Sequence, residues 1–308
     1  MHPVPPPAGP EQNYGFAGCY RHPDRLTGVR CVRCNRPICP ECQHAASVGF
    51  QCPDDVRAGR ASVRAARTVV GARLTDGPPV VTYGLITVNV FVYLLTSIGA
   101  GANLVDNTGQ TQHRLELVPY LVGANGDYYR LLSSMFVHYG PIHILLNMYA
   151  LWVIGPAVER ALGWWRYSAL YLIAGLGGSV ACLLFQDPLT ASAGASGAIF
   201  GLFAALLALT RRTRVPTTQI WVVVAINFVF TFSVPGISIW GHVGGFAFGG
   251  LAALALLAWD LRPNSRLPSL QVQVVGLVAL LLVLGVATGV RGQSLKSYQP
   301  PAISQTGP

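Results

Sequence analysis

The hydrophobic residues of this chain fall into seven long runs separated by shorter polar segments. Most runs approach the ~20 apolar residues that an α-helix needs to cross a bilayer, and the run at 195–210 is the shortest. The pattern therefore predicts seven membrane-spanning helices. They are expected near residues 80–99, 141–160, 166–186, 195–210, 217–234, 238–259 and 272–290.

Composition agrees with this pattern and excludes a soluble globular protein. Hydrophobic residues make up 52% of the 308 positions and charged residues only 11%. The mean hydropathy is +0.45. These values lie outside the range of soluble domains. We expect an all-α polytopic membrane protein.

The net charge of +9 comes almost entirely from arginines, which cluster beside the apolar runs. Arg73 precedes the first run, Arg166 the third, Arg211 follows the fourth and Arg262 the sixth. All of these fall on one side of the membrane, and the positive-inside rule makes that side cytoplasmic. We therefore expect a multi-pass protein of the cell membrane, with a cytoplasmic N-terminus and an external C-terminus.

The chain before the first run divides into three parts. Residues 1–17 are rich in proline and glycine and are predicted to be disordered. Residues 57–77 form a basic juxtamembrane linker. Between them, residues 18–56 carry six of the seven cysteines in closely spaced pairs. The pairs are Cys19-x2-His22, Cys31-x2-Cys34, Cys39-x2-Cys42 and Cys52-x2-Asp55. This spacing predicts one or two structural zinc ions, which would supply the folding free energy of so short a segment.

Two polar residues lie about one turn inside apolar runs, each among small residues: Ser196 in Gly194-Ala195-Ser196-Gly197, and His242 beside Gly241. Polar groups at membrane depth are costly and are presumed functional. A serine and a histidine at matched depth suggest a nucleophile and its base. Both runs enter from the outer side, so the two residues are expected at similar depth near the outer leaflet.

Glycines spaced four apart give these two runs a reason to touch. Gly197 and Gly201 form one stripe, and Gly241, Gly245 and Gly249 form another. Such stripes let transmembrane helices approach closely. At this point an alternative stays open: ordinary small-residue packing, with an incidental serine and a histidine bonded to a carbonyl.

A third segment, His138 to Asn147, adds hydrogen-bond donors. Pro141 suits the first turn of a helix, and His143 and Asn147, four apart, share a face of it. An acyl-transfer site needs donors aimed at a developing oxyanion, and the Ser196 N–H could be a third. For Asn147 alone, an interhelical hydrogen bond is the alternative.

These motifs, in this order, resemble the rhomboid intramembrane serine proteases, over roughly residues 78–260. The resemblance implies a Ser196–His242 dyad without an acidic third member, and an oxyanion site made of His143, Asn147 and the Ser196 amide. It places His138, Gly194, Gly197 and Phe200 around the active site, with a structural role first for His138. Many relatives carry a tyrosine that stacks on the histidine at the position of Phe200; a phenyl ring is expected to keep the stacking. The segment 261–308, with its seventh span and a disordered tail, makes this a six-plus-one form.

Two further matches concern structure. Tyr129-Arg130 resembles a Trp-Arg pair in the loop after the first span. Gly155-x3-Glu159 resembles a structural glutamate motif at the inner end of the second span. The long connection 101–140 is expected to lie in the membrane interface, although an ordinary exposed loop remains open.

The N-terminal segment resembles the B-box-type cross-brace zinc fingers found ahead of some actinobacterial rhomboids. In a cross-brace, Cys19, His22, Cys39 and Cys42 would bind one zinc. Cys31, Cys34, Cys52 and a fourth ligand would bind the other. The family pattern suggests a cysteine there; this chain has Asp55, with Asp54 and His44 as rivals. The segment lacks a helix of base-reading residues, so we expect a structural module or a cytoplasmic protein partner, and no nucleic acid.

The expected function is cleavage of transmembrane protein substrates near the outer leaflet through an acyl-enzyme, with no cofactor needed for catalysis. One alternative is a non-catalytic rhomboid-like scaffold that binds transmembrane helices. Another is a metalloprotease that uses His138 and His143. These two histidines are five apart and lie off a common helical face, unlike the HExxH arrangement.

Overall fold

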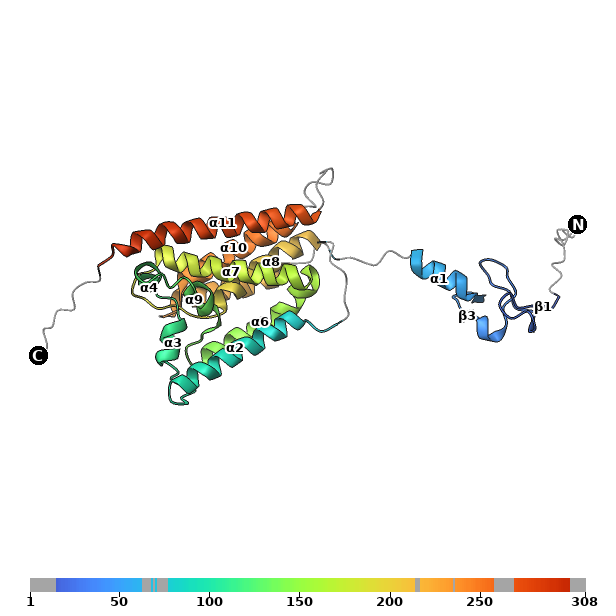
Figure 1. The fold of residues 1–308 in the computed structure, drawn as a ribbon, viewed down its shortest axis with the longest axis horizontal. Helices are drawn as coiled ribbons and strands as arrows, with labels where there is room; N and C mark the ends of the chain where they lie inside the picture. The colour runs from blue at the N-terminus through green and yellow to red at the C-terminus, as the bar shows by residue number, and fades with distance from the viewer. Residues whose placement is uncertain are drawn as a thin grey trace, which may run out of the picture. The chain divides into compact units, whose positions relative to one another are not determined.

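The computed structural model describes residues 15–62, 68, 70, 77–213, 217–234, 236–257 and 269–299. The chain divides into two compact units, Met1–Ala65 and Ala66–Pro308 (Figure 1). The segment 1–14, most of the linker beyond Ser62, the arginines near residue 262, and the tail from residue 300 lie outside the described residues.

The N-terminal unit is built from short elements around a very small core. Two antiparallel hairpins pair two-residue strands, and one helix follows them. The buried hydrophobic residues of the unit are five cysteines and Ile38. The candidate metal ligands are thus themselves the core. The elements are β1 (Ala17–Gly18), β2 (Leu26–Thr27), η1 (Pro40–Cys42), β3 (His44–Ala45), β4 (Phe50–Gln51) and α1 (Pro53–Ser62).

Among the residues that the structure describes, the second unit has an apolar helix at each of the seven predicted positions. By length and composition, five of them suffice to cross a membrane, and α8 and α9 are shorter apolar helices. The helices are α2 (Val80–Gly99), α6 (Gly140–Leu162), α7 (Trp164–Phe185), α8 (Ser196–Thr213), α9 (Thr218–Ser233), α10 (Ile239–Leu257) and α11 (Ser269–Lys296).

Helix α7 lies at the centre of this bundle. Two thirds of its most apolar window is buried (67%), against 17% for α11. Helices α7, α8, α10 and α11 run side by side, while α2 and α6 form a second pair (Figure 1). A core of apolar side chains fills the space between them.

Helix α11 extends beyond the predicted span 272–290 at both ends, and polar residues close to both ends of that span find partners inside the bundle. Gln273 accepts a hydrogen bond from Arg166 Nε at 2.8 Å and donates to the carbonyl of Leu256. Arg291 donates to the carbonyl of Leu183 at 3.2 Å. Satisfied polar groups can continue a helix past its apolar stretch.

The connection between α2 and α6 folds into four short helices held by Arg130. This buried guanidinium pairs with Asp127 at 3.0 Å and donates to the carbonyls of His113 and Glu116. These three partners of one side chain brace the connection. The helices are α3 (Gln110–Leu115), α4 (Pro119–Ala124), α5 (Arg130–Ser133) and η2 (Ser134–Phe136).

Glu159, near the end of α6, joins α6 to the start of α2. Its carboxylate accepts hydrogen bonds from the backbone N–H groups of Val81 (3.0 Å) and Thr82 (2.8 Å), and from the Thr82 hydroxyl. The first N–H groups of a helix have no intrahelical acceptor, so a carboxylate there satisfies them and favours the helix dipole.

Glycines bring α7, α8 and α10 into backbone contact. A Cβ atom at Gly245 would collide with the carbonyl of Gly197, and one at Gly249 would collide with the backbone of Gly201. The two stripes read from the sequence therefore face each other. Helix α7 adds a third surface that the spacing did not indicate: a Cβ at Gly178 would lie 2.6 Å from the carbonyl of Gly241.

We expect Gly245→Ala to destabilise the bundle, because the new methyl group meets backbone that cannot rotate away. Overpacking of this kind typically costs about 1–3 kcal/mol. Gly285→Ala is the matched control, since a Cβ there would have nothing within 4 Å. Thermal unfolding in detergent should give a melting temperature several degrees lower for Gly245→Ala only. Equal melting temperatures for the two variants would contradict the close packing.

Candidate active site

Ser196 and His242 form a hydrogen-bonded pair. The Ser196 Oγ lies 2.7 Å from the His242 Nε2. His242 is 8% exposed and sits in the first turn of α10, whereas Ser196 is the first residue of α8. The predicted span 195–210 begins only one residue earlier. The place of Ser196 at the helix start leaves its backbone N–H among the amides without an intrahelical acceptor.

The segment before Ser196 is held by residues from the connection between α2 and α6. Gly194 takes a φ of +128°, which ends the extended chain before the helix begins. Its N–H donates to the carbonyl of Ser134 at 2.9 Å, and the Ala195 N–H lies 3.4 Å from the His138 Nε2. The other ring nitrogen of His138 lies 3.3 Å from the carbonyl of Phe136. His138 therefore contacts the serine segment through backbone atoms.

The ring of His242 is held by a stacked aromatic ring on its face and by a hydroxyl at its edge. Phe200 stacks on it with ring centroids 4.1 Å apart and an interplanar angle of 13°. Thr231, in α9, places its hydroxyl 2.7 Å from the His242 Nδ1. Sequence reasoning expected the stacking and missed Thr231. No motif marks Thr231: a threonine inside an apolar run is common, and its side chain usually bonds its own helix.

His143 and Asn147 lie on the other side of Ser196, one turn apart on α6. The Tyr139 N–H donates to the His143 Nδ1 at 3.2 Å, which leaves the proton of the neutral ring on Nε2. That Nε2 faces the serine segment, since a Cβ at Gly194 would lie 2.8 Å from it. Asn147 uses one amide proton on the His143 carbonyl at 2.9 Å and keeps another.

A large cavity of about 700 Å³ joins these groups. Ser196, His242, His143 and Asn147 all line it, together with apolar side chains from α6, α8, α9 and α10. The reactive groups therefore meet one space that is mainly apolar and has a few convergent polar atoms, as ligand sites usually do.

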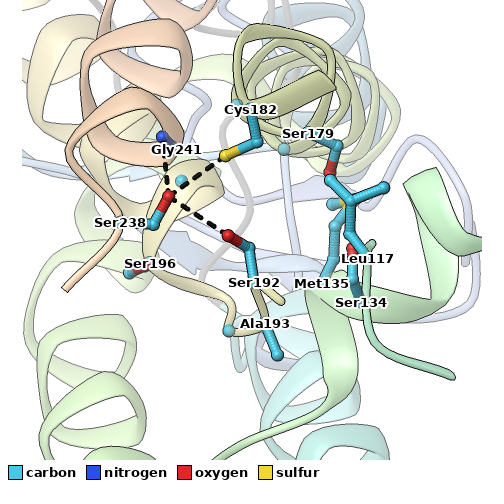
Figure 2. Close-up of a pocket in the computed structure, with 14 residues that line it drawn as sticks. Leu117, Ser134, Met135, Ser179, Cys182, Ser192, Ala193, Ser196, Ser238 and Gly241 are labelled. Carbon is cyan, nitrogen blue, oxygen red and sulfur yellow. Dashed lines mark hydrogen bonds between the residues drawn. The ribbon is translucent and has the colours of Figure 1, made fainter. Parts of the chain in front are cut away.

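A second, small cavity of about 30 Å³ is also lined by Ser196 (Figure 2). Its polar corner is made by Ser238, whose hydroxyl meets the Cys182 thiol at 3.1 Å, the Ser192 hydroxyl at 3.5 Å and the Gly241 N–H at 3.2 Å. A space of this size with several polar partners suits one water molecule or a small side chain.

The N-terminal unit contains two groups of side chains that could hold metal ions. Within each group the ligand atoms all lie within 4.8 Å of one another. Zinc with thiolate ligands at 2.3 Å in a tetrahedron needs neighbouring ligand atoms roughly 3.5–4 Å apart, so both donor sets fit. The first group is Cys19, His22, Cys39 and Cys42, and the second is Cys31, Cys34, Cys52 and Asp55.

The second group includes Asp55 and neither of its rivals. Hydrogen bonds from the thiols of Cys34, Cys31 and Cys52 lower the pKa of Asp55 to about 2, so this carboxylate is ionised at neutral pH. Asp54 instead pairs with Arg36 at 3.2 Å, and His44 belongs to the exposed strand β3. An ionised carboxylate beside three thiols is a competent zinc-binding set.

The fold and site together define a helical membrane protein with a serine–histidine pair in the first turns of two packed helices. Residues 125–259 match the family model described as "Rhomboid domain". Over this segment, which carries both Ser196 and His242, the chain is similar to rhomboid domains.

Individual proteins similar to the chain also carry rhomboid names. The chain is 37% identical to "Rhomboid protease GluP" of Bacillus subtilis (strain 168) over 62% of its length and 37% of the relative. It is 33% identical to "Rhomboid-type serine protease 2" of Emericella nidulans over 44% of its length and 28% of the relative. It is 33% identical to "RHOMBOID-like protein 7" of Arabidopsis thaliana, over 55% and 62% of the two chains. The chain thus spans from under a third to under two thirds of the lengths of these relatives.

We expect Gly194→Ala to slow the reaction of Ser196 with a fluorophosphonate probe by about tenfold or more, because the methyl group would push against His143. Gly236→Ala is the matched control: it has a φ of +85° but nothing within 4 Å of an added Cβ. Both variants carry the strain of a positive φ, so a slower reaction only at Gly194 isolates the crowding. Equal labelling rates of the two variants would contradict this geometry.

Proposed function

We propose that the chain is an intramembrane serine endopeptidase that cleaves transmembrane protein substrates near the outer leaflet. The observation that carries the proposal is the 2.7 Å contact between Ser196 Oγ and His242 Nε2, at the wall of a large cavity. The serine protease names of two relatives support it. Shape alone would not, because one fold hosts many functions.

The geometry assigns a role to each group in peptide hydrolysis. Ser196 Oγ attacks the scissile carbonyl carbon while His242 Nε2 takes its proton. The protonated histidine then gives this proton to the departing amine, and an ester with Ser196 remains. A water molecule, deprotonated by His242, attacks this ester and releases the acid, and Ser196 regains its proton. No cofactor enters these steps.

Three donors would stabilise the oxyanion of both tetrahedral intermediates. They are the Nε2–H of His143, the free amide proton of Asn147 and the backbone N–H of Ser196, which also lies at the positive end of the α8 dipole. Removing one such donor typically lowers kcat by about 10²–10³. The site thus combines donors on α6 and α8 with the nucleophile on α8 and the base on α10.

The cavity suits an extended segment of a membrane protein. Its walls are formed by the outer ends of α6, α9 and α10, with apolar residues such as Leu146, Phe230 and Trp240 beside the polar centre. The arginine pattern supports a topology in which this end of the bundle lies on the outer side of the cell membrane, with the N-terminus in the cytoplasm and the C-terminus outside.

Two other functions are weaker. A metalloprotease would need His138 and His143 as ligands, yet both ring nitrogens of His138 and the Nδ1 of His143 already have hydrogen-bond partners. Among the described residues, the groups that could hold a metal ion lie in the N-terminal unit. A non-catalytic scaffold would have no use for an aligned serine and histidine.

Ser196→Ala should abolish cleavage of a transmembrane substrate while the melting temperature in detergent stays the same. Ser168→Ala is the control, since that hydroxyl only bonds the Trp164 carbonyl of its own helix. Cleavage is measured with purified protein and a tagged single-span substrate reconstituted in vesicles. Cleavage by Ser196→Ala at the wild-type rate would refute the proposal. Failure of a fluorophosphonate to label the wild-type protein would also refute it.

We also propose that the N-terminal unit binds two zinc ions that supply its folding free energy and that it serves as a structural module or contacts a cytoplasmic protein. A set of three thiolates with one imidazole or one carboxylate binds zinc in preference to harder cations. The unit buries little besides these ligands, so a metal-free form would lose most of its stabilisation.

The full-length protein should contain about two equivalents of zinc, and Cys42→Ser should contain about one. Asp55→Cys should keep both, because thiolate replaces carboxylate. Cys182→Ser, outside the unit, controls for the loss of a cysteine. Elemental analysis of the purified proteins measures these ratios. Two equivalents in Cys42→Ser, or none in the wild type, would contradict the assignment.

A further inference from the structure

We propose that Thr231 is a positioning residue for the proposed proteolysis: it holds His242 in the tautomer that can accept the Ser196 proton. The inference rests on the proposed function and concerns the same site. It is carried by two short contacts of one hydroxyl. The Thr231 Oγ1 lies 2.7 Å from the Asn227 carbonyl oxygen and 2.7 Å from the His242 Nδ1.

The proton of that hydroxyl has one best acceptor. A hydroxyl carries one proton and two lone pairs. The carbonyl of Asn227 has no proton to give, so a 2.7 Å contact between the two oxygens requires the Thr231 proton between them. The hydroxyl then meets His242 with a lone pair, and the Nδ1 of the ring must carry the hydrogen.

The proton on Nδ1 also determines the state of Nε2, the other ring nitrogen of His242. A neutral imidazole with its proton on Nδ1 has a free lone pair on Nε2. That lone pair faces the Ser196 Oγ at 2.7 Å, which is the arrangement of a base ready to accept a proton. In the opposite tautomer, Nε2–H would point at the serine, and His242 could not act as its base.

Thr231 also acts when the histidine becomes charged. After it takes the serine proton, the ring is an imidazolium and its Nδ1–H is a stronger donor. The Thr231 oxygen, polarised by its own bond to Asn227, accepts that hydrogen. Thr231 is only 2% exposed, so water does not replace this acceptor readily. Phe200 covers the ring face, and Thr231 fixes rotation within the ring plane.

An acidic residue often takes this place beside a catalytic histidine. Here the contacts of the ring that the structure describes are with Ser196, Thr231 and Phe200. A neutral hydroxyl avoids the cost of an ionised carboxylate at membrane depth and still selects the tautomer.

The test compares variants at residue 231 in cleavage of the vesicle-embedded substrate. Thr231→Val keeps the shape and removes the hydroxyl, and should lower kcat about ten- to a hundredfold with little change in KM. Thr231→Ser keeps the hydroxyl and should retain most of the activity. Thr87→Val is the control, since Thr87 bonds only the Tyr83 carbonyl of its own helix. The fluorophosphonate labelling rate should follow kcat.

The outcomes separate this inference from the proposed function. If the wild type cleaves, Ser196→Ala does not, and Thr231→Val cleaves like Thr87→Val, the positioning role is overturned and proteolysis stands. If Thr231→Val is poorly folded by thermal unfolding, Thr231→Ser against Thr231→Ala gives the same comparison, because only the hydroxyl differs. Equal kcat for these two would overturn the inference, and a lower kcat for Thr231→Ala alone would support it.

Discussion

Ser196 can reach His242 because α8 and α10 touch through their backbones. Ordinary side chains between two helices would hold their axes too far apart for a direct hydrogen bond between a serine and a histidine. Gly197, Gly245 and Gly249 remove those side chains at the crossing, and Gly178 on α7 lets a third helix support the pair. The hydrogen bond between Ser196 and His242 therefore depends on the close packing of α8 and α10. The dyad is a consequence of where glycine allows two helices to meet.

Much of this arrangement could be predicted from the sequence, because its causes are periodic. Apolar run lengths set the helices, and glycines four apart mark the contact faces. These local rules brought Ser196 and His242 to the same depth. They also placed His143 and Asn147 on one face of α6, where the structure has them lining the same cavity.

What could not be predicted depends on contacts between segments far apart in the chain. Ser196 begins its helix because Ser134 and His138 hold the residues before it. Thr231 faces His242 because of the way α9 lies beside α10, and a single threonine in an apolar run carries no sign of that. Likewise, the choice of Asp55 over Asp54 follows from a salt bridge between Asp54 and Arg36, which sequence spacing does not show.

The contacts of Ser196 and His242 that the structure describes are made by hydroxyls, an imidazole and an aromatic ring. Surface reactions steered by ionised groups weaken as salt screens their attraction. A centre assembled from uncharged dipoles and backbone contact has little for salt to screen. For the proposed proteolysis, the chemical step at this centre would therefore be insensitive to the ionic strength of the surrounding water.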